Sequence, residues 1–285
     1  MLAHVLRVVS LLAVCGCQAI DQDRTAPGAA VPPQFERPVV TQPAASGVPK
    51  PGLRHVDSIG WVWPPFVGRF AFARRIALDR PDSLGQDLCR QGYPCYRALD
   101  QADSLGTDGL ELVADYASEL VYQRPGALPA PVARLFPPRQ TYPVYVVNAT
   151  PRTKLLYGNG IAVFAVQEAR DRTGQWRPIE SKGLLSGNGH WAVKLRPQQM
   201  AVFLVDKYAG DFVTQLRVRV QNGESRYVSA PFAGRIDERQ FRVPELDYRS
   251  LESDPAGAVD GMYYGAVPAA VDTIQLGKDL SSTTK

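Results

Sequence analysis

The segment His190-Trp191-Ala192-Val193-Lys194-Leu195 alternates apolar and polar side chains along most of its length. Because successive side chains of a strand point to opposite faces, Trp191, Val193 and Leu195 share one face, while His190 and Lys194 face water. One buried and one solvated face is typical of antiparallel sheets, whereas the strands of parallel sheets are covered on both faces. The segment therefore predicts an antiparallel strand with Trp191 in the core.

Other segments on either side of it have strand character. Residues 212–220 alternate in the same way, with Gln215, Arg217 and Arg219 on the solvated side. Residues 161–166 and 200–205 are short, continuous apolar runs. A buried helix segment is the alternative for each run, but their length, β-branched content and flanking turns favour central strands. Segments 142–147, 176–180 and 226–230 bring the predicted set to about seven strands.

Turn-forming residues separate these strands. Gly and Asn tolerate positive φ angles, and Asn222-Gly223 is the strongest hairpin signal among them. Short strands at regular spacing, each followed by a turn, favour a β-sandwich over a barrel. We therefore predict a mainly β chain with an antiparallel β-sandwich domain at residues 141–232. The other predicted turns contain Gly158-Asn159-Gly160, Gly187-Asn188-Gly189, Thr173-Gly174 and Ala209-Gly210.

One of these turns carries a resemblance to a known fold. Gly210-Asp211-Phe212, followed by an alternating strand, resembles the corner before strand F of immunoglobulin-like domains. The Tyr of that corner, and the disulfide and core Trp spacing of true immunoglobulin domains, are absent. The resemblance covers about a third of the chain and implies an immunoglobulin-like sandwich without implying a function.

Composition sets broad limits on the function. The chain has 285 residues, 45% of them hydrophobic, with 24 Gly and 24 Pro, which favours β structure together with extended segments. The formal net charge is only +4 and is spread along the chain. Such a mild balance without a basic run does not predict nucleic-acid binding.

The N-terminus has the pattern of an export signal. His4 and Arg7 precede an apolar stretch that is too short to span a bilayer, so residues 1–16 read as a signal peptide. Val14-Cys15-Gly16-Cys17 resembles a bacterial lipobox, which implies lipidation (palmitate) at Cys17. An ordinary secretory signal is the alternative. The resemblance implies a lipid-anchored protein of the bacterial cell envelope, with the outer membrane favoured over the inner and its side left open.

The residues between this signal and the sandwich are of two kinds. Residues 17–52 are rich in Pro and Ala and predict an extended tether. Residues 53–140 form a smaller mixed N-terminal region with many aromatic side chains, in which Trp61, Trp63 and Phe66 are candidate binding residues. Its two cysteines, Cys89 and Cys95, are the only pair in the mature chain and predict a disulfide.

Two further segments complete the predicted organisation. Thr107 or Asp108 is placed to cap one amphipathic helix, in which Leu112, Tyr116 and Leu120 form an apolar stripe. Residues 233–285 read as an extended C-terminal arm. This arm keeps Tyr263 and Tyr264, further candidate binding residues that either contact a partner or pack back on the chain's own body.

The sequence shows no pattern of catalytic residues. His55 and His190 lack the spacing of metal ligands, and no nucleophile elbow, phosphate loop or dinucleotide fingerprint occurs. We therefore predict no metal, no cofactor and no enzymatic activity, with an unrecognised hydrolase site as a remote alternative. The main hypothesis is an accessory or structural envelope protein that docks onto other envelope proteins. The alternative is a glycan-binding surface lipoprotein that stacks polysaccharide on Trp61 and Trp63.

Overall fold

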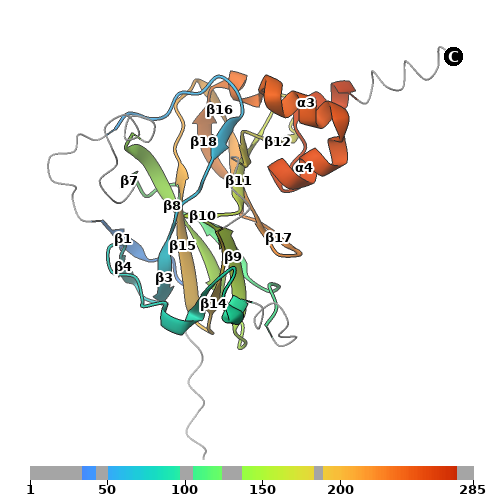
Figure 1. Cartoon of the computed structure of the whole chain (residues 1–285). Helices are drawn as coiled ribbons and strands as arrows, with labels where there is room; N and C mark the ends of the chain where they lie inside the picture. The colour runs from blue at the N-terminus through green and yellow to red at the C-terminus, as the bar shows by residue number, and fades with distance from the viewer. Residues whose placement is uncertain (1–33, 43–50, 97–104, 124–136, 183–188, 275–285) are drawn as a thin grey trace, which may run out of the picture. The chain divides into compact units, whose positions relative to one another are not determined.

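A five-stranded antiparallel sheet, which we call the central sheet, has buried side chains packed on both of its faces. It belongs to a computed structural model that describes residues 34–42, 51–96, 105–123, 137–182 and 189–274 (Figure 1). Across the sheet its strands are β3 (Phe66–Ala71), β15 (Gln199–Asp206), β8 (Arg139–Asn148) and β6 (Glu111–Ala114), with β7 (Leu120–Tyr122) also paired to β8.

Strand β15 lies inside this sheet, between β3 and β8. Its side chains belong alternately to two core clusters, one on each face, and residues 200–205 are at most 3% exposed. Burial on both faces is the reason that the apolar run is continuous rather than alternating. The prediction of a central strand here is confirmed.

Two other sheets pack around the same core as the central sheet. The β14 sheet contains β10 (Ala162–Val163), β9 (Lys154–Asn159), β14 (His190–Leu195) and β5 (Leu88–Arg90). The β16 sheet contains β12 (Trp176–Pro178), β11 (Ala165–Arg170), β16 (Phe212–Asn222) and β17 (Ser225–Val228), with β18 (Phe232–Ile236) also paired to β16. Two parallel pairs join β1 (Val39–Thr41) to β4 (Arg75–Ala77) and β2 (Gly60–Val62) to β13 (Glu180–Lys182).

The main core lies between these three sheets. Trp191, Val193 and Leu195 of β14 enter it together and are at most 5% exposed, while His190 and Lys194 are half-buried. Side chains from β8 and β15 face them from the central sheet, and others from β16 complete the cluster. The chain is mainly β, as predicted, and β14 has the predicted bounds and the predicted apolar face.

The regions expected on either side of residue 141 form one folded unit rather than separate parts. Strand β3 pairs with β15, β5 pairs with β14, and β6 pairs with β8, so the N-terminal region supplies strands to the same sheets as the later residues. Part of the expected tether is also strand, because β1 pairs with β4, and Phe35 packs against Phe72 and Tyr145. Pairing partners this distant in sequence leave no signal in a local pattern.

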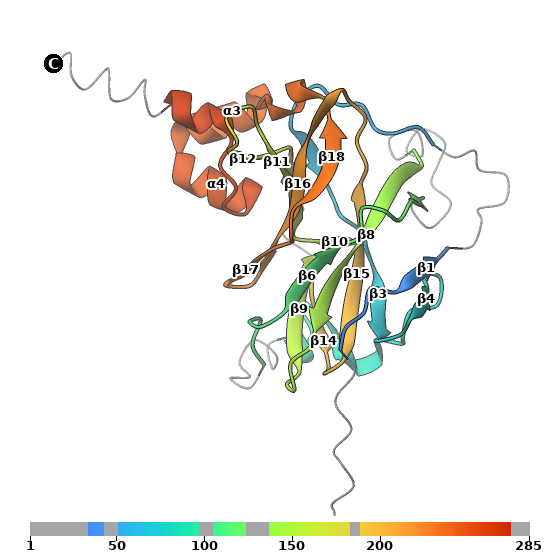
Figure 2. The same ribbon diagram turned by 180° about the vertical axis from the view of Figure 1, so that it is seen from behind.

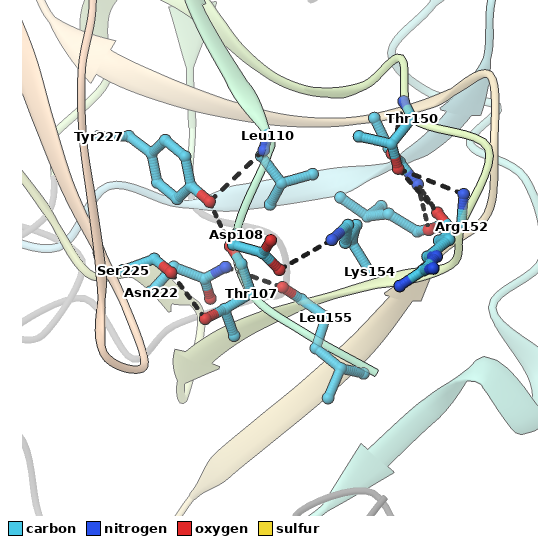
Figure 3. Close-up of polar contacts among 12 residues, drawn as sticks. Thr107, Asp108, Leu110, Thr150, Arg152, Lys154, Leu155, Asn222, Ser225 and Tyr227 are labelled. Atoms are coloured by element: carbon cyan, nitrogen blue, oxygen red, sulfur yellow. Dashed lines mark hydrogen bonds and ion pairs between the residues drawn. The ribbon is translucent and has the colours of Figure 1, made fainter. Parts of the chain in front are cut away.

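The amphipathic helix predicted from Thr107 onward is wrong. Leu110 and Leu112 are both buried, at the two-residue spacing of a strand, and Gly109 adopts a left-handed φ of 69° that ends any helix. Thr107 and Asp108 bind other segments instead of capping a helix (Figure 3). The Tyr227 hydroxyl donates to the Thr107 carbonyl, and Lys154 Nζ lies 2.8 Å from Asp108 Oδ1.

The prediction of an extended C-terminal arm is also wrong, because the segment contains helices. The segment forms α3 (Glu245–Ser253) and α4 (Pro255–Tyr263), which lie beside the β16 sheet in both views (Figures 1 and 2). The Asp254 side chain caps α4 by accepting a 3.0 Å hydrogen bond from Gly257 N. Short helices gain most of their stability from packing, and these share a buried cluster with Ile59 near the other end of the chain. The arm therefore packs on its own body.

Two short 3-10 helices are η1 (Gly85–Asp87) and η2 (Glu238–Phe241).

The turns and strand lengths differ in detail from the prediction. The Asn222-Gly223 hairpin joins β16 to β17, and Gly223 takes the expected positive φ of 57°. The strands are more numerous than the set of seven, in part because Phe164 divides the run at 161–166 and Ile179 divides the run at 176–180. Strands β8, β15 and β16 are longer than the segments predicted for them. Residues 187 and 188 of the predicted Gly187-Asn188-Gly189 turn lie outside the described residues.

Candidate functional site

The outer face of the β16 sheet gathers arginine and tryptophan side chains from three strands. Cross-strand register places Glu168 opposite Arg217 and Arg170 opposite Trp176, so all four point to the same side. Arg219 lies two residues further along β16 and shares that side. We call these five residues the arginine–tryptophan face.

Glu168 holds the two arginines of β16 in place. Its Oε2 accepts a hydrogen bond of 2.7 Å from Arg217 Nε and one of 3.2 Å from Arg219 Nε, and its Oε1 accepts from the Nη2 of both. Glu168 is 1% exposed, whereas the arginine side chains remain 19% and 15% exposed. The carboxylate is therefore enclosed, whereas the two arginine side chains remain partly open to solvent.

The ring of Trp176 contacts two cations. The Arg217 guanidinium is 4.2 Å from the centre of the Trp176 ring, and the Arg170 guanidinium is 5.1 Å from it. Each contact of this kind contributes about 0.5–2 kcal/mol, depending on solvent exposure. The indole is half-buried and thus remains partly open to solvent.

The face carries excess positive charge and an apolar border. The face contains three guanidinium groups and one carboxylate, so two positive charges are uncompensated within it. On the same side of the sheet, Val213 is 65% exposed and Val228, which pairs with Arg219, is 40% exposed. Exposed apolar side chains beside Trp and Arg resemble the composition of protein-binding surfaces.

A buried polar network is the other candidate for a functional centre. Glu180 Oε1 accepts hydrogen bonds of 2.7 Å from the Tyr208 hydroxyl and from Gln167 Nε2, and Oε2 accepts one of 2.7 Å from Gln167 N. Burial, opposed by these hydrogen bonds and reinforced by Asp206, raises the pKa of Glu180 to about 7. A pKa in this range suits a general base, so access to the site decides its role.

In this conformation the Glu180 carboxyl group is too enclosed to act on a substrate. The cavity it lines has a volume of only about 10 Å³, bordered by Trp63, Pro64 and Pro65. Such a volume holds a single water molecule at most, so no substrate reaches the carboxyl group. The network instead joins β13 to β11 and β15 through hydrogen bonds of Gln167, one of them to the Asp206 carbonyl at 3.0 Å.

The structure does not bring the predicted binding residues together on one exposed surface. Trp61 and Trp63 are both half-buried, and Trp61 Nε1 donates a 3.2 Å hydrogen bond to Asp247 of α3. Phe66 packs against Trp191, with 4.9 Å between ring centres. Tyr263 and Tyr264 are 0% and 6% exposed, because α4 packs them onto the body. The predicted role of these five residues, contact with a partner or a polysaccharide, requires them to be exposed on one surface, and in this structure they are not.

The predicted disulfide is not formed in the structure. Cys89 and Cys95 are both thiols, Cys89 buried in β5 and Cys95 exposed. Burial, and then a hydrogen bond with the Cys95 thiol, raise the pKa of Cys89 to about 11. The two side chains are thus neighbours, and their pairing under oxidising conditions stays a prediction. Cys17 and the rest of residues 1–33 lie outside the described residues.

Within the described ranges, no three His, Cys, Asp or Glu side chains are grouped so as to hold a metal ion. His55 is exposed, and His190 is half-buried with its ring 5.9 Å from the Phe164 ring. None of the helices in this part of the chain has the length and apolar character needed to cross a bilayer.

The sequence showed part of the arginine–tryptophan face. The alternation of β16 placed Arg217 and Arg219 on the solvated side, but the partner strand was not identified. Trp176 and Glu168 gave no signal, because only the pairing of β11 with β12 and β16 brings them beside these arginines. Comparisons of this sequence and structure with protein-family models, curated proteins and solved structures give no match.

Proposed function

We propose that this chain is a lipid-anchored accessory protein of the cell envelope that docks onto an acidic surface of another envelope protein through the arginine–tryptophan face. The observation that carries the proposal is the contact of the Trp176 ring with two guanidinium groups on a face with uncompensated positive charge. Trp and Arg are enriched among residues that dominate binding energy at protein interfaces. An acidic partner would supply the carboxylates that this face lacks.

The rigidity of the face also supports docking. Glu168 fixes two of its arginines by paired hydrogen bonds, so little side-chain freedom remains to be lost on binding. The geometry favours a flat contact over the enclosure of a small molecule, because the side chains come from neighbouring strands of one sheet. This arrangement fits the predicted class of accessory protein without requiring chemistry.

Two other surfaces considered for binding fit less well. A C-terminal arm that reaches toward a partner would need Tyr263 and Tyr264 at the surface, and both are buried. A polysaccharide platform would need Trp61 and Trp63 exposed on one flat face, and the Trp61 indole is engaged by Asp247. Docking through the β16 sheet therefore replaces both as the preferred mode of contact.

The anchor and the finer fold class belong to the same proposal. Lipidation at Cys17 would place the folded body at a membrane surface, behind a Pro-rich and Ala-rich segment. We also propose that the sheets around the main core form an immunoglobulin-like sandwich, supported by the corner at Gly210 before β16. Labelled fatty acid should be incorporated into the protein and not into Cys17→Ser, which should also leave the membrane fraction.

Docking is tested by placing a charge at the border of the face. A photo-crosslinking side chain at Gln215, which is exposed on the same side of β16, should give a specific protein adduct in native membranes. Val213→Glu should reduce the adduct several-fold by repelling an acidic partner, whereas Val213→Lys should retain or increase it. Val213 is 65% exposed, so both changes leave the core intact.

The control position for the crosslinker is Arg80, whose side chain is 85% exposed and lies outside the β16 sheet. Equal adducts from both positions, or equal effects of the two Val213 variants, would contradict an electrostatic docking face. Capture of an acidic polysaccharide, with the same dependence on charge at Val213 and without a protein adduct, would assign the face to a glycan instead.

A further inference from the structure

A second basic site lies on a different part of the fold, at the end of β14. An open cleft of about 810 Å³ is formed there between β3, η1 and the start of the β14–β15 connection. Its volume is within the range of small-molecule sites, which extends from about 300 to 1,000 Å³. The polar and charged side chains of the lining include Arg69, Ser83, Gln86, Asp87, Lys194 and Arg196.

Arg69 is the buried anchor of this cleft. Its side chain is 5% exposed, and its Nη1 donates hydrogen bonds to Asp87 Oδ2 at 2.6 Å and to the Lys194 carbonyl at 3.0 Å. Its Nη2 donates to the Ser83 carbonyl at 2.9 Å. These contacts hold η1 and the segment before it against β14, so the wall of the cleft is preformed.

One carboxylate serves two guanidinium groups in the cleft. Asp87 Oδ2 lies 2.6 Å from Arg69 Nη1 and 3.0 Å from Arg196 Nη2. Burial alone would raise the pKa of Asp87, but the hydrogen bonds from Arg69 and Arg196 outweigh it and hold that pKa below its ordinary value. Asp87 is therefore ionised at neutral pH and compensates one of the positive charges.

Among the described residues, the cleft contains more positive than negative charge. Lys194 also lines the cleft and has no ion pair within the part of the chain that the structure describes, so three cations face one anion. In addition, Nε of Arg69 is buried and has no hydrogen-bond partner among the described residues. A buried guanidinium N–H without an acceptor is unfavourable.

We propose that this cleft binds a phosphate group, with Lys194 and Arg196 as its contacts and Arg69 as the residue that positions them. The two uncompensated positive charges match the charge of about −1.5 to −2 that a phosphate monoester carries at neutral pH. Arginine is well suited to phosphate oxygens because its donors are arranged in a planar fork. Ser83 and Cys95 also line the cleft and provide further polar groups.

The phosphate could belong to a soluble ester or to a phospholipid headgroup, and the two sources differ only in what carries the group. Binding to the full chain is therefore measured by calorimetry with inorganic phosphate and with glycerol 3-phosphate, at constant ionic strength. A separate co-sedimentation arm uses phosphatidylcholine vesicles with and without phosphatidic acid. The lipidation-deficient Cys17→Ser chain is used in this arm, so that a lipid anchor cannot contribute to vesicle binding.

The test compares two double variants with equal loss of charge. Lys194→Gln/Arg196→Gln removes the two proposed contacts, and Arg80→Gln/Arg249→Gln removes two cations that are 85% and 72% exposed and lie outside the cleft. Saturable binding should weaken about tenfold or more in the first variant, because a hydrogen bond to a charged group contributes about 1.5–3 kcal/mol. It should be unchanged in the second variant.

Each outcome decides the proposal. Binding of the soluble probes with this pattern assigns the site to free phosphate or its esters, and binding confined to phosphatidic acid vesicles with the same pattern assigns it to a headgroup. The absence of saturable binding to every probe, or equal losses in both double variants, would overturn the proposal. If Arg196→Gln disturbs folding by releasing Asp87, the single variant Lys194→Gln, which breaks no ion pair among the described residues, decides the same question.

Discussion

The Tyr208 hydroxyl donates a 2.7 Å hydrogen bond to Glu180 Oε1 in the interior, where Tyr208 is 2% and Glu180 1% exposed. Burial of an ionised carboxyl group in such surroundings is unfavourable, because the charge loses its hydration. The three hydrogen-bond donors around Glu180 offset only part of this free energy. The pair therefore makes stability depend on pH, although no substrate reaches it.

The first prediction is that Glu180 destabilises the fold as the pH rises. Its pKa is about 7 in the folded protein, against an ordinary value of 4.5, so the folded state retains a proton that the unfolded chain has lost. The contribution of Glu180 to the free energy of unfolding is complete below about pH 4.5 and is lost as the pH rises through about 7. The change is on the order of 3 kcal/mol.

Urea denaturation across this pH range measures the effect. Because other carboxylates also titrate, the quantity to follow is the difference in the free energy of unfolding between the native chain and Glu180→Gln. The free energy of unfolding of the native chain minus that of Glu180→Gln should fall as the pH rises. Parallel pH profiles for the two proteins would show that Glu180 keeps an ordinary pKa.

A second prediction concerns the two faces of β14. Trp191 is 5% exposed, packs against Phe66 and donates a 3.0 Å hydrogen bond to the Gly160 carbonyl. Trp191→Ala should therefore lower the free energy of unfolding by about 3–5 kcal/mol. His190 is half-buried at the edge of the same strand, and His190→Ala should be nearly neutral. Denaturant midpoints for the two variants provide the measurement, and equal mild effects would be inconsistent with the core position of Trp191.

A third prediction is that the C-terminal helices are structural. A chain that ends after Phe241 loses α3 and α4 and uncovers Ile59, which is 2% exposed in the intact fold. Its free energy of unfolding should fall by several kcal/mol, since full burial of one such side chain contributes about 1.5–3 kcal/mol. The control ends after Ile274 and keeps both helices, and it should match the full chain.

A point variant separates packing from simple truncation damage. Asp247 accepts hydrogen bonds from Trp61 Nε1 at 3.2 Å and from the Tyr263 hydroxyl at 3.1 Å. Asp247→Ala leaves the buried Tyr263 hydroxyl and the half-buried Trp61 indole without this acceptor. The change should lower the free energy of unfolding by about 1–3 kcal/mol in urea denaturation. Full stability of both the truncated chain and Asp247→Ala would mean that the helices lie on the body without supporting it.

The fourth prediction concerns the cysteines. In reduced protein at about pH 8, iodoacetamide should modify Cys95 much faster than Cys89, because Cys95 is exposed while Cys89 is buried with a pKa of about 11. Mass spectrometry after short labelling measures the two rates. Protein purified without reductant should have a mass lower by two hydrogens if the predicted disulfide forms, and two free thiols in that sample would rule the disulfide out.

Local sequence patterns determined the strands that have one buried and one solvated face. The alternation in 190–195 and 212–220 follows directly from the two-residue repeat of a strand, and the Asn222-Gly223 hairpin follows from the left-handed φ that glycine tolerates. The continuous run at 200–205 was recognised as a central strand for a related reason, since burial on both faces removes the alternation.

Only the tertiary structure decided which strands become neighbours and which side chains therefore meet. Glu168 meets Arg217 and Arg219 because β11 pairs with β16, and Asp87 meets Arg196 across 109 residues of sequence. The apolar residues at 112, 116 and 120 fit a helical stripe, yet they belong to the strand and turn region next to β8, where pairing outweighs local propensity. Both basic sites arise in this way, because a local pattern shows which face a side chain takes but does not specify what lies across from it.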